Sequence, residues 1–358
     1  MKKILISLFC ILLVAGVSAQ DKTFIVIGKV IDSASRLPLA GASAFCPNTT
    51  YGSVSNAEGM FMLKLPSGGY DLVVSYTGYD KKLFRISDNQ NNSDTLIVDL
   101  PQQDKTMAEV SVVASNEVPD GLAKYGEFFI SNFIGTSPNA AYCKVMNPET
   151  LRFFYNKKRN RLKVTAREDV LIHNYALGYT IRYQLDSFNY DYNSNISQYT
   201  GFPLFTEMDT TVEARTQFIK NRARTYLGSR LHFMRSFYNS NVVDEGFIVE
   251  DLSQGASKAK IIGDLYDTEQ YALDSGEVLI GWKGKYRINY KSVFPDKKFL
   301  EEFKLPSNSR YQVTILDIAD GFVIERNGYF YEQYDVVNSG YWAWKKVAEI
   351  LPYDYVYQ

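Results

Sequence analysis

The sequence predicts a mainly β protein, α+β overall, in which a small immunoglobulin-like N-terminal β-sandwich precedes a larger β-rich domain. From Thr23 to about Ser115, short runs of β-branched and aromatic residues alternate with turn residues at spacings of roughly 8 to 12 residues, as sandwich strands do. Aromatic residues make up 15% of the chain, with 27 Tyr and 22 Phe, a composition that favours sheets. One long segment, residues 212–238, has helical periodicity instead.

The first 19 residues resemble a removable secretion signal rather than part of a fold. Lys2 and Lys3 precede an apolar run from Ile4 to Val17, and small residues at Val17-Ser18-Ala19 follow it. The run is shorter than the roughly 20 residues that span a bilayer. We therefore predict cleavage after residue 19 and export to the periplasm, the outer membrane or the cell surface, with no membrane span in the mature chain.

Residues 20–115 form the predicted sandwich domain. Its candidate strands are Thr23–Ile31, Ala42–Cys46, Gly52–Val54, Gly59–Leu65, Tyr70–Tyr76, Lys81–Ile86, Thr95–Leu100 and Glu109–Val113. Gly59 and Gly78 fall at breaks between these runs, where glycine permits tight turns. Cys46 and Cys143 fall in different predicted domains, and the sequence leaves open whether they pair or remain free thiols.

Four motifs of this segment carry a family resemblance. They are Gly28-Lys29-Val30-Ile31-Asp32, Leu37-Pro38-Leu39-Ala40-Gly41-Ala42, Ser55-Asn56-Ala57-Glu58-Gly59-Met60-Phe61 and Val74-Ser75-Tyr76-Thr77-Gly78-Tyr79. Together they resemble the carboxypeptidase-like regulatory domain that is common in envelope proteins of Bacteroidota. The resemblance implies a transthyretin-like sandwich of about seven strands. It also implies a non-catalytic domain, since in carboxypeptidases the zinc site lies in a separate domain.

A connector helix at residues 116–135 is predicted to lead into the β-rich C-terminal domain, residues 136–358. Leu122 to Ile134 has apolar residues at helical spacing after Pro119-Asp120-Gly121. Strands at 151–155 and 162–166 flank a basic tip and predict a hairpin. Motifs such as Asn174-Tyr175-Ala176-Leu177-Gly178-Tyr179 and Leu351-Pro352-Tyr353-Asp354-Tyr355 resemble a region restricted to Bacteroidota, to which the resemblance attaches no reaction.

The segment 212–238 predicts a long amphipathic basic helix. Apolar residues from Val212 to Phe237 recur mostly at threes and fours, although Gly228 allows a kink or two helices. Its six cations are the candidate partner-binding residues: Arg215, Lys220, Arg222, Arg224, Arg230 and Arg235. They could dock an envelope protein or an anionic glycan such as lipopolysaccharide. Alternatively, they could bridge to acidic residues of the same chain.

Near the C-terminal end, Tyr341, Trp342 and Trp344 are candidate glycan-stacking residues. Aromatic rings of this kind provide the platforms on which sugars stack. The same alternation describes a half-buried strand whose rings belong to the core. Both interpretations remain open at this point.

The chain offers little for catalysis. Basic and acidic residues number 39 and 40, so no basic footprint indicates a nucleic-acid partner. His173 and His232 are the two histidines. Neither lies in a His-x-x-Glu or His-Glu-x-x-His pattern, and both are predicted to be structural. We predict no catalytic residue, no metal and no cofactor.

These observations predict a non-enzymatic binding or assembly module of the cell envelope, associated with outer-membrane transport or glycan handling. Two alternatives remain open. One is a carbohydrate- or peptide-active enzyme with an accessory sandwich. The other is an accessory partner of a TonB-dependent receptor, because similar sandwiches occur at the N-termini of such receptors.

Overall fold

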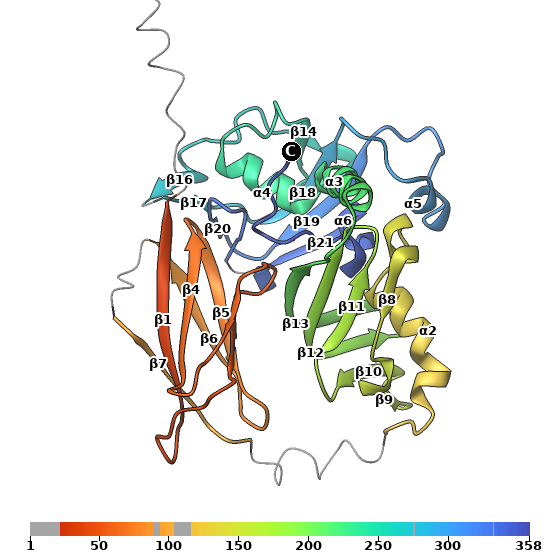
Figure 1. Ribbon diagram of the computed structural model, residues 1–358. Helices are drawn as coiled ribbons and strands as arrows, with labels where there is room; N and C mark the ends of the chain where they lie inside the picture. Colours follow the sequence, from red (N-terminus) through yellow and green to blue (C-terminus); the bar gives the residue numbers. More distant parts are fainter. Residues whose placement is uncertain (1–21, 89–93, 104–115, 275, 332) are drawn as a thin grey trace, which may run out of the picture.

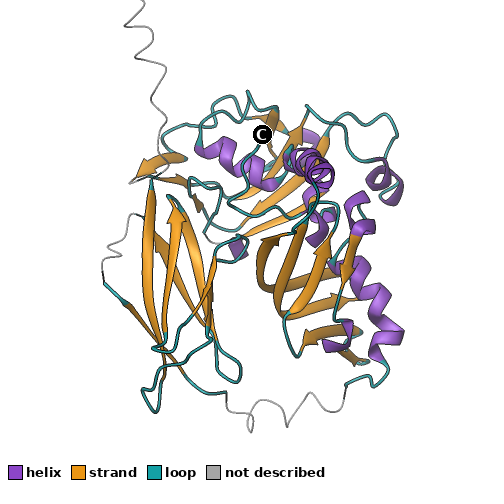
Figure 2. Ribbon diagram, viewed as in Figure 1, coloured by secondary structure: helices purple, strands orange, loops and turns teal. Residues whose placement is uncertain are grey.

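The computed structural model describes residues 22–88, 94–103, 116–274, 276–331 and 333–358 (Figure 1). The predicted secretion signal and the predicted strand Glu109–Val113 lie outside the described residues. Strands predominate both in the N-terminal domain and in the larger part that follows it (Figure 2). The predicted mainly β architecture is therefore confirmed.

Among the described residues, seven strands form the N-terminal sandwich. One sheet has the order β4-β1-β7, and the other has the order β3-β2-β5-β6. The strands are β1 (Thr23–Asp32), β2 (Ser43–Phe45), β3 (Gly52–Val54), β4 (Met60–Pro66), β5 (Gly69–Ser75), β6 (Lys82–Ser87) and β7 (Leu96–Leu100). In β4, Phe61, Leu63 and Leu65 are buried while Met62 and Lys64 are exposed, because alternate side chains of a strand point to opposite faces.

A six-stranded antiparallel sheet follows, and the predicted connector helix packs on it as α2 (Gly121–Phe133). The sheet order is β8-β11-β12-β10-β9, and β13 pairs along the length of β12. Its elements are η1 (Pro138–Tyr142), β8 (Cys143–Val145), η2 (Pro148–Thr150), β9 (Leu151–Asn156), β10 (Arg161–Ala166), β11 (Val170–Asn174), β12 (Tyr179–Asp191) and β13 (Ile196–Glu207). Phe129 and Phe133, one helical turn apart, are fully buried against this sheet.

The C-terminal part contains a five-stranded sheet, β15-β14-β18-β19-β21, and a three-stranded sheet, β16-β17-β20. Its strands are β14 (Phe247–Asp251), β15 (Lys260–Ile261), β16 (Tyr271–Asp274), β17 (Glu277–Ile280), β18 (Gly284–Tyr290), β19 (Gln312–Ile318), β20 (Phe322–Ile324) and β21 (Val336–Gly340). Its helices are α3 (Val212–Tyr226), α4 (Arg230–Tyr238), η3 (Ala256–Lys258), α5 (Lys297–Glu302), η4 (Gln333–Asp335), α6 (Tyr341–Trp344) and η5 (Val347–Glu349). Of the described helices, none is sufficiently long and apolar to cross a bilayer.

The predicted long basic helix is two helices. α3 ends at Tyr226 and α4 begins at Arg230. Between them, Gly228 has φ of +74°, a left-handed conformation that glycine adopts readily. The predicted apolar stripe is wrong in its first half, because the side chains of Val212 and Ile219 are 77% and 37% exposed.

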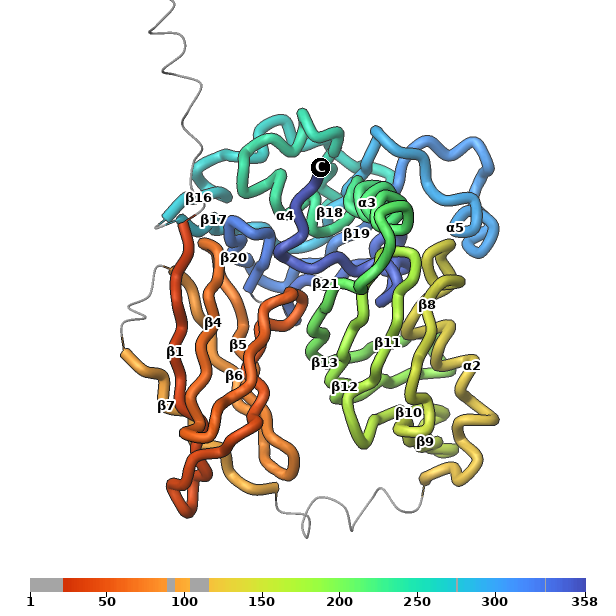
Figure 3. Tube along the Cα trace, in the orientation of Figure 1, coloured from red at the N-terminus to blue at the C-terminus, as the bar shows by residue number. Residues whose placement is uncertain are grey.

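The sandwich contacts the rest of the chain in several places, including side chains of β12, and two of these contacts bear on the site. In the first, the loop between β2 and β3 pairs with β13. Asn48 N donates to Pro203 O at 2.7 Å, and Phe205 N donates to Thr49 O at 2.9 Å. Figure 3 shows this loop reaching from the sandwich towards β13. In the second, the turn after β20 meets β5, where Asn327 Nδ2 donates to Gly69 O at 3.0 Å. These contacts fix the sandwich against the larger part.

Candidate functional site

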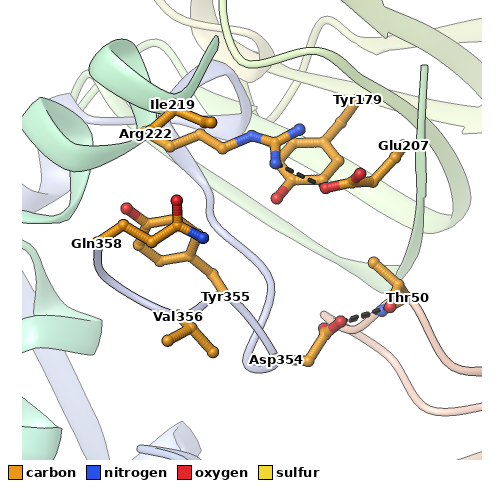
Figure 4. A pocket seen from close by; sticks show the side chains of 9 residues that line it. All are labelled: Thr50, Tyr179, Glu207, Ile219, Arg222, Asp354, Tyr355, Val356 and Gln358. Atoms are coloured by element: carbon orange, nitrogen blue, oxygen red, sulfur yellow. Dashed lines mark hydrogen bonds and ion pairs between the residues drawn. The ribbon is translucent and has the colours of Figure 1, made fainter. Parts of the chain in front are cut away.

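A pocket of about 380 Å³ lies where the sandwich, the six-stranded sheet, α3 and the C-terminal tail meet (Figure 4). Small-molecule sites usually enclose about 300 to 1,000 Å³. The lining residues are Thr50 of the sandwich loop, Tyr179 and Glu207 of β12 and β13, Ile219 and Arg222 of α3, and Asp354, Tyr355, Val356 and Gln358 of the tail. Residues from five separate segments therefore build one pocket.

Asp354 joins the tail to the sandwich at the floor of this pocket. Its carboxylate accepts a hydrogen bond from Thr50 N at 2.9 Å and a second from the Thr50 hydroxyl. The neighbouring Tyr353 N donates to Asn48 O at 2.6 Å. Burial raises the pKa of Asp354, and the bonds from Thr50 oppose that rise. The arrangement holds the pocket wall in place.

Arg222 supplies the cation nearest the pocket, and it is fully engaged within the protein. Its Nε donates to Leu177 O at 2.7 Å, and its Nη1 pairs with Glu207 at 2.6 Å. The guanidinium also lies 3.9 Å from the centre of the Tyr179 ring. Since its side chain is only 12% exposed, Arg222 fastens α3 to the start of β12 and has little capacity to hold a partner.

The face of α3 that packs on the sheet is defined by Phe218, Asn221 and Arg222. Asn221 Nδ2 donates to Ala176 O at 2.8 Å, and a Cβ atom at Gly178 would lie 2.1 Å from the Phe218 ring. Helical geometry places residues three and four apart on one face. Lys220 and Arg224 therefore lie on the opposite, outward face.

Three cations of α3 are exposed: Arg215, Lys220 and Arg224. Arg215 lies on the same row of the helix as Ile219, one turn away, and so points towards the pocket side. Within the described residues, none of the three has an acidic side chain within ion-pair distance. Arg224 donates one hydrogen bond, to Asn221 Oδ1 at 3.0 Å. Lys220 and Arg224 lie on the outward face and Arg215 on the pocket side, and we call the exposed surface that carries these three cations the basic α3 surface.

The two cations of α4 behave differently. Arg235 is half-buried and donates to three backbone carbonyls: Asn327 O at 3.0 Å, and Tyr353 O and Tyr355 O at 2.8 Å each. Arg230 is exposed, and its guanidinium lies 5.2 Å from the centre of the Phe330 ring. The six predicted partner-binding cations therefore do not form one continuous face, and Arg222 and Arg235 serve the fold.

The candidate glycan-stacking residues lie in the core. Tyr341, Trp342 and Trp344 belong to the short helix α6 rather than to a strand, and they are 4%, 7% and 6% exposed. Trp342 Nε1 donates to Gly228 O at 2.7 Å, and Trp344 Nε1 donates to Glu302 at 2.8 Å. With their rings covered and their N–H groups satisfied, these residues present no face on which a sugar could stack.

The histidines and cysteines also have structural surroundings. His232 is buried, with Nε2 at 3.1 Å from Glu245, and burial lowers its pKa. His173 lies 3.1 Å from the Tyr175 hydroxyl. Cys46 and Cys143 are both free thiols, and burial raises the pKa of each. No group of three or more His, Cys, Asp or Glu that could hold a metal ion occurs among the described residues.

A buried carboxyl lies at the second contact between the sandwich and the larger part. Glu325 is 1% exposed and accepts a hydrogen bond from the Tyr331 hydroxyl at 2.6 Å. It packs against β5 so closely that a Cβ atom at Gly69 would lie 2.3 Å from its Oε1. Burial raises the pKa of Glu325 to about 7, and nearby Glu277 contributes to the rise. Protonation of this carboxyl is therefore coupled to the interdomain contact.

Several residues of the site are absent from the sequence-based prediction. Thr50, Glu207 and Asp354 meet only because the fold joins segments that are far apart in the chain. The available signal was an isolated carboxylate between two tyrosines, Tyr353-Asp354-Tyr355, near the chain's end. A polar residue in an aromatic run is typical of a buried hydrogen-bonding position.

Comparison with known families identifies the first domain. Residues 26–112 match the family model described as CarboxypepD_reg-like domain. The chain carries a carboxypeptidase regulatory-like domain. This regulatory-like domain contains the seven-stranded sandwich and the Asn48–Thr50 loop, so the four motifs found in the sequence identified it correctly. The match ends before α2, and it does not extend to the pocket walls supplied by α3 and the tail.

Other comparisons add little. No curated protein matches the chain. Among solved structures, a 9R-lipoxygenase from Cyanothece PCC8801 is 10% identical with a TM-score of 0.17. The alignment covers 60% of this chain and 48% of the lipoxygenase chain, and thus about half the length of that protein. A similarity this low carries no argument about fold or activity.

Proposed function

We propose that the protein is a non-enzymatic binding or assembly module of the bacterial cell envelope, in the Bacteroidota, and that it holds an anionic glycan on the basic α3 surface. The observation that carries the proposal is the absence of acidic partners for Arg215, Lys220 and Arg224 within the described residues. Cations in such a position attract negative groups from solution. Arginine also binds phosphate and carboxylate through two parallel hydrogen bonds.

The surroundings of these cations favour a glycan over a protein surface. Stable protein interfaces usually have an apolar or aromatic centre. On the outward face of α3, the neighbours of Lys220 and Arg224 are one acidic residue, Glu213, and two neutral polar residues, Thr216 and Gln217, so this face has no apolar centre. A hydrated partner that carries phosphate or carboxylate groups fits this face better than an apolar one.

The regulatory-like domain supports the assembly role. It contacts the larger part at the Asn48–Thr50 loop and at Gly69, so that α3 is held beside the sandwich on a braced framework. Export through the N-terminal signal would bring the chain to the envelope, where phosphorylated and acidic glycans occur. The function proposed is therefore retention of such a glycan.

The test is binding of the purified protein to lipopolysaccharide from its host, with dephosphorylated lipopolysaccharide as a second ligand. The triple variant Arg215→Glu, Lys220→Glu, Arg224→Glu should lower affinity for the phosphorylated form by at least about tenfold. The matched control reverses three exposed cations at the hairpin tip, Lys157, Lys158 and Arg159, and should bind like the wild type. Equal binding by the wild type and the α3 variant would reject the proposal, and capture of an acidic protein instead would reassign the partner.

A further inference from the structure

A second unpartnered surface lies around α5, on residues 291–313. Five large apolar side chains are exposed there: Phe294 (70%), Phe303 (51%), Leu305 (42%), Tyr311 (46%) and Val313 (36%). Two contacts hold parts of this segment together: Gln312 Nε2 donates to Phe294 O at 3.4 Å, and the Phe303 ring lies 4.8 Å from that of Phe299 in α5. Soluble surfaces rarely gather so many exposed apolar side chains without a binding role.

The same segment is rich in exposed cations. They are Lys291, Lys297, Lys298, Lys304 and Arg310, and within the described residues none of them has an acidic side chain in ion-pair range. Of the three acids in the segment, two have internal roles. Asp296 caps α5 by accepting from Lys298 N at 2.9 Å, and Glu302 accepts from Trp344 Nε1 at 2.8 Å. With these five cations against three acids, the segment carries a net positive charge.

The shape of the segment favours insertion into a soft surface. Every residue from Glu301 to Asn308 is exposed, and Figure 1 shows α5 and its loops projecting from the body of the protein. A rigid protein partner requires a complementary flat or grooved surface. Projecting Phe and Leu side chains among lysines are instead typical of segments that lie in the headgroup region of a membrane.

We infer that the α5 segment docks on a lipid surface that carries anionic headgroups. Phe294 and Leu305 enter the boundary between headgroups and acyl chains, while Lys297, Lys298 and Lys304 contact lipid phosphates. Each lysine near an anionic bilayer strengthens binding through its charge, and each apolar side chain that enters the boundary strengthens it through burial. This docking is independent of the glycan site on α3.

The experiment is flotation of the purified protein with vesicles of phosphatidylcholine, with and without phosphatidylglycerol. The wild type should float with the anionic vesicles and only weakly with the neutral ones. Substitution of Lys297, Lys298 and Lys304 by Gln should weaken binding to anionic vesicles by roughly 100-fold. The double variant Phe294→Ser, Leu305→Ser should reduce binding to both vesicle types.

Two control variants test whether vesicle binding belongs to the α5 segment. Tyr334 is 87% exposed outside the segment, so Tyr334→Ser should float like the wild type. The α3 triple variant should also float normally, which distinguishes failure of this inference from failure of the glycan proposal. Unchanged melting temperatures would show that the α5 variants fold. The inference is wrong if the wild type floats with neither type of vesicle, or if the α5 variants float as well as the wild type does. Crosslinking from position 294 to an envelope protein would also contradict the inference.

Discussion

α3 and α4 come from one basic stretch of sequence, but their side chains have different fates. Both begin with a hydroxyl cap: Thr211 Oγ1 accepts from Ala214 N, and Ser229 Oγ accepts from His232 N. α4 buries Phe233, Met234 and Phe237 in the core. α3 buries only Thr225 and Tyr226, at its C-terminal end. One continuous basic stretch of sequence thus forms one helix that is buried in the core and one that is largely exposed.

The two helices differ in what their cations can reach. Arg235 donates to three carbonyls that lie about 90 to 120 positions further along the chain, whereas Arg224 donates, among the described residues, to Asn221 alone. The sequence around each arginine does not reveal this difference in contacts. Availability for a partner is therefore a property of the tertiary contacts.

The break between the helices should be the most sensitive point. Gly228→Ala forces a left-handed conformation on alanine and places a Cβ atom 2.4 Å from Gln312 Oε1 and 2.5 Å from the Tyr290 ring. Because both neighbours are buried, we expect a loss of about 4 kcal/mol in the free energy of unfolding. Urea denaturation measures it. A loss below about 1 kcal/mol would show that the packing of the two helices does not depend on a glycine at this position.

Arg235→Ala should have the next largest effect. It removes three charge-assisted hydrogen bonds and leaves half-buried carbonyls of the tail and of the turn at Asn327 without a donor. We expect a loss of about 3 kcal/mol. The matched change on the other helix, Arg224→Ala, should stay within about 0.5 kcal/mol. Similar losses for the two variants would remove the distinction between the helices.

A substitution of Arg222 tests how much this arginine contributes to holding α3 on the sheet. Arg222→Ala breaks its bonds to Leu177 O and Glu207 and its contact with Tyr179. Since Glu207 is 60% exposed, the ion pair itself contributes little, and we expect a loss of about 1 to 2 kcal/mol. Lys220→Ala, two residues away on the outward face, should be neutral in the same denaturation assay. A neutral Arg222→Ala would mean that α3 is held without this arginine.

The turn that α4 supports should make stability depend on pH. The folded pKa of Glu325 is about 7, above its ordinary value of 4.5. Between these values the folded state holds the proton more tightly, so stability falls as the pH rises from about 4.5 to 7. Glu325→Gln should remove this contribution, which is about 3 kcal/mol at most, and should raise stability relative to the wild type above pH 7.

The difference in stability between the wild type and Glu325→Gln, followed over pH, reports on this carboxyl, since the other titrating groups are common to both proteins. Thermal melting from pH 4 to pH 8 provides the measurement, and the exposed Glu301→Gln is the control. Parallel curves for the wild type and Glu325→Gln would show that Glu325 titrates normally in the folded protein.

The sandwich could be predicted closely from the sequence, because its information is local. Alternation in Tyr70–Tyr76 and glycines at the turns determine where strands begin and end, and seven of the eight candidate strands appear within about one residue of their predicted bounds. The eighth, Glu109–Val113, lies outside the described residues. The family resemblance also depends on such local motifs.

The site could be predicted only in part. Helical periodicity indicated the basic segment, but it could not show that Arg222 would find Glu207 or that Arg235 would find the tail. The run Tyr341–Trp344 alternates like a strand, yet it folds as a turn of helix because Gly340, at φ +81°, redirects the chain there. Asp354 and Thr50 are separated by 304 positions, so no local pattern connects them.

The most direct test of the central claim, that α3 is the free and functional helix, is envelope association in the host. The full-length protein, the α3 triple charge-reversal variant and the Lys157, Lys158 and Arg159 charge-reversal control would be expressed at equal levels, and envelope and soluble fractions would be quantified. We predict that only the α3 variant shifts to the soluble fraction, with an unchanged melting temperature. Envelope retention of the α3 variant equal to that of the control would contradict the claim.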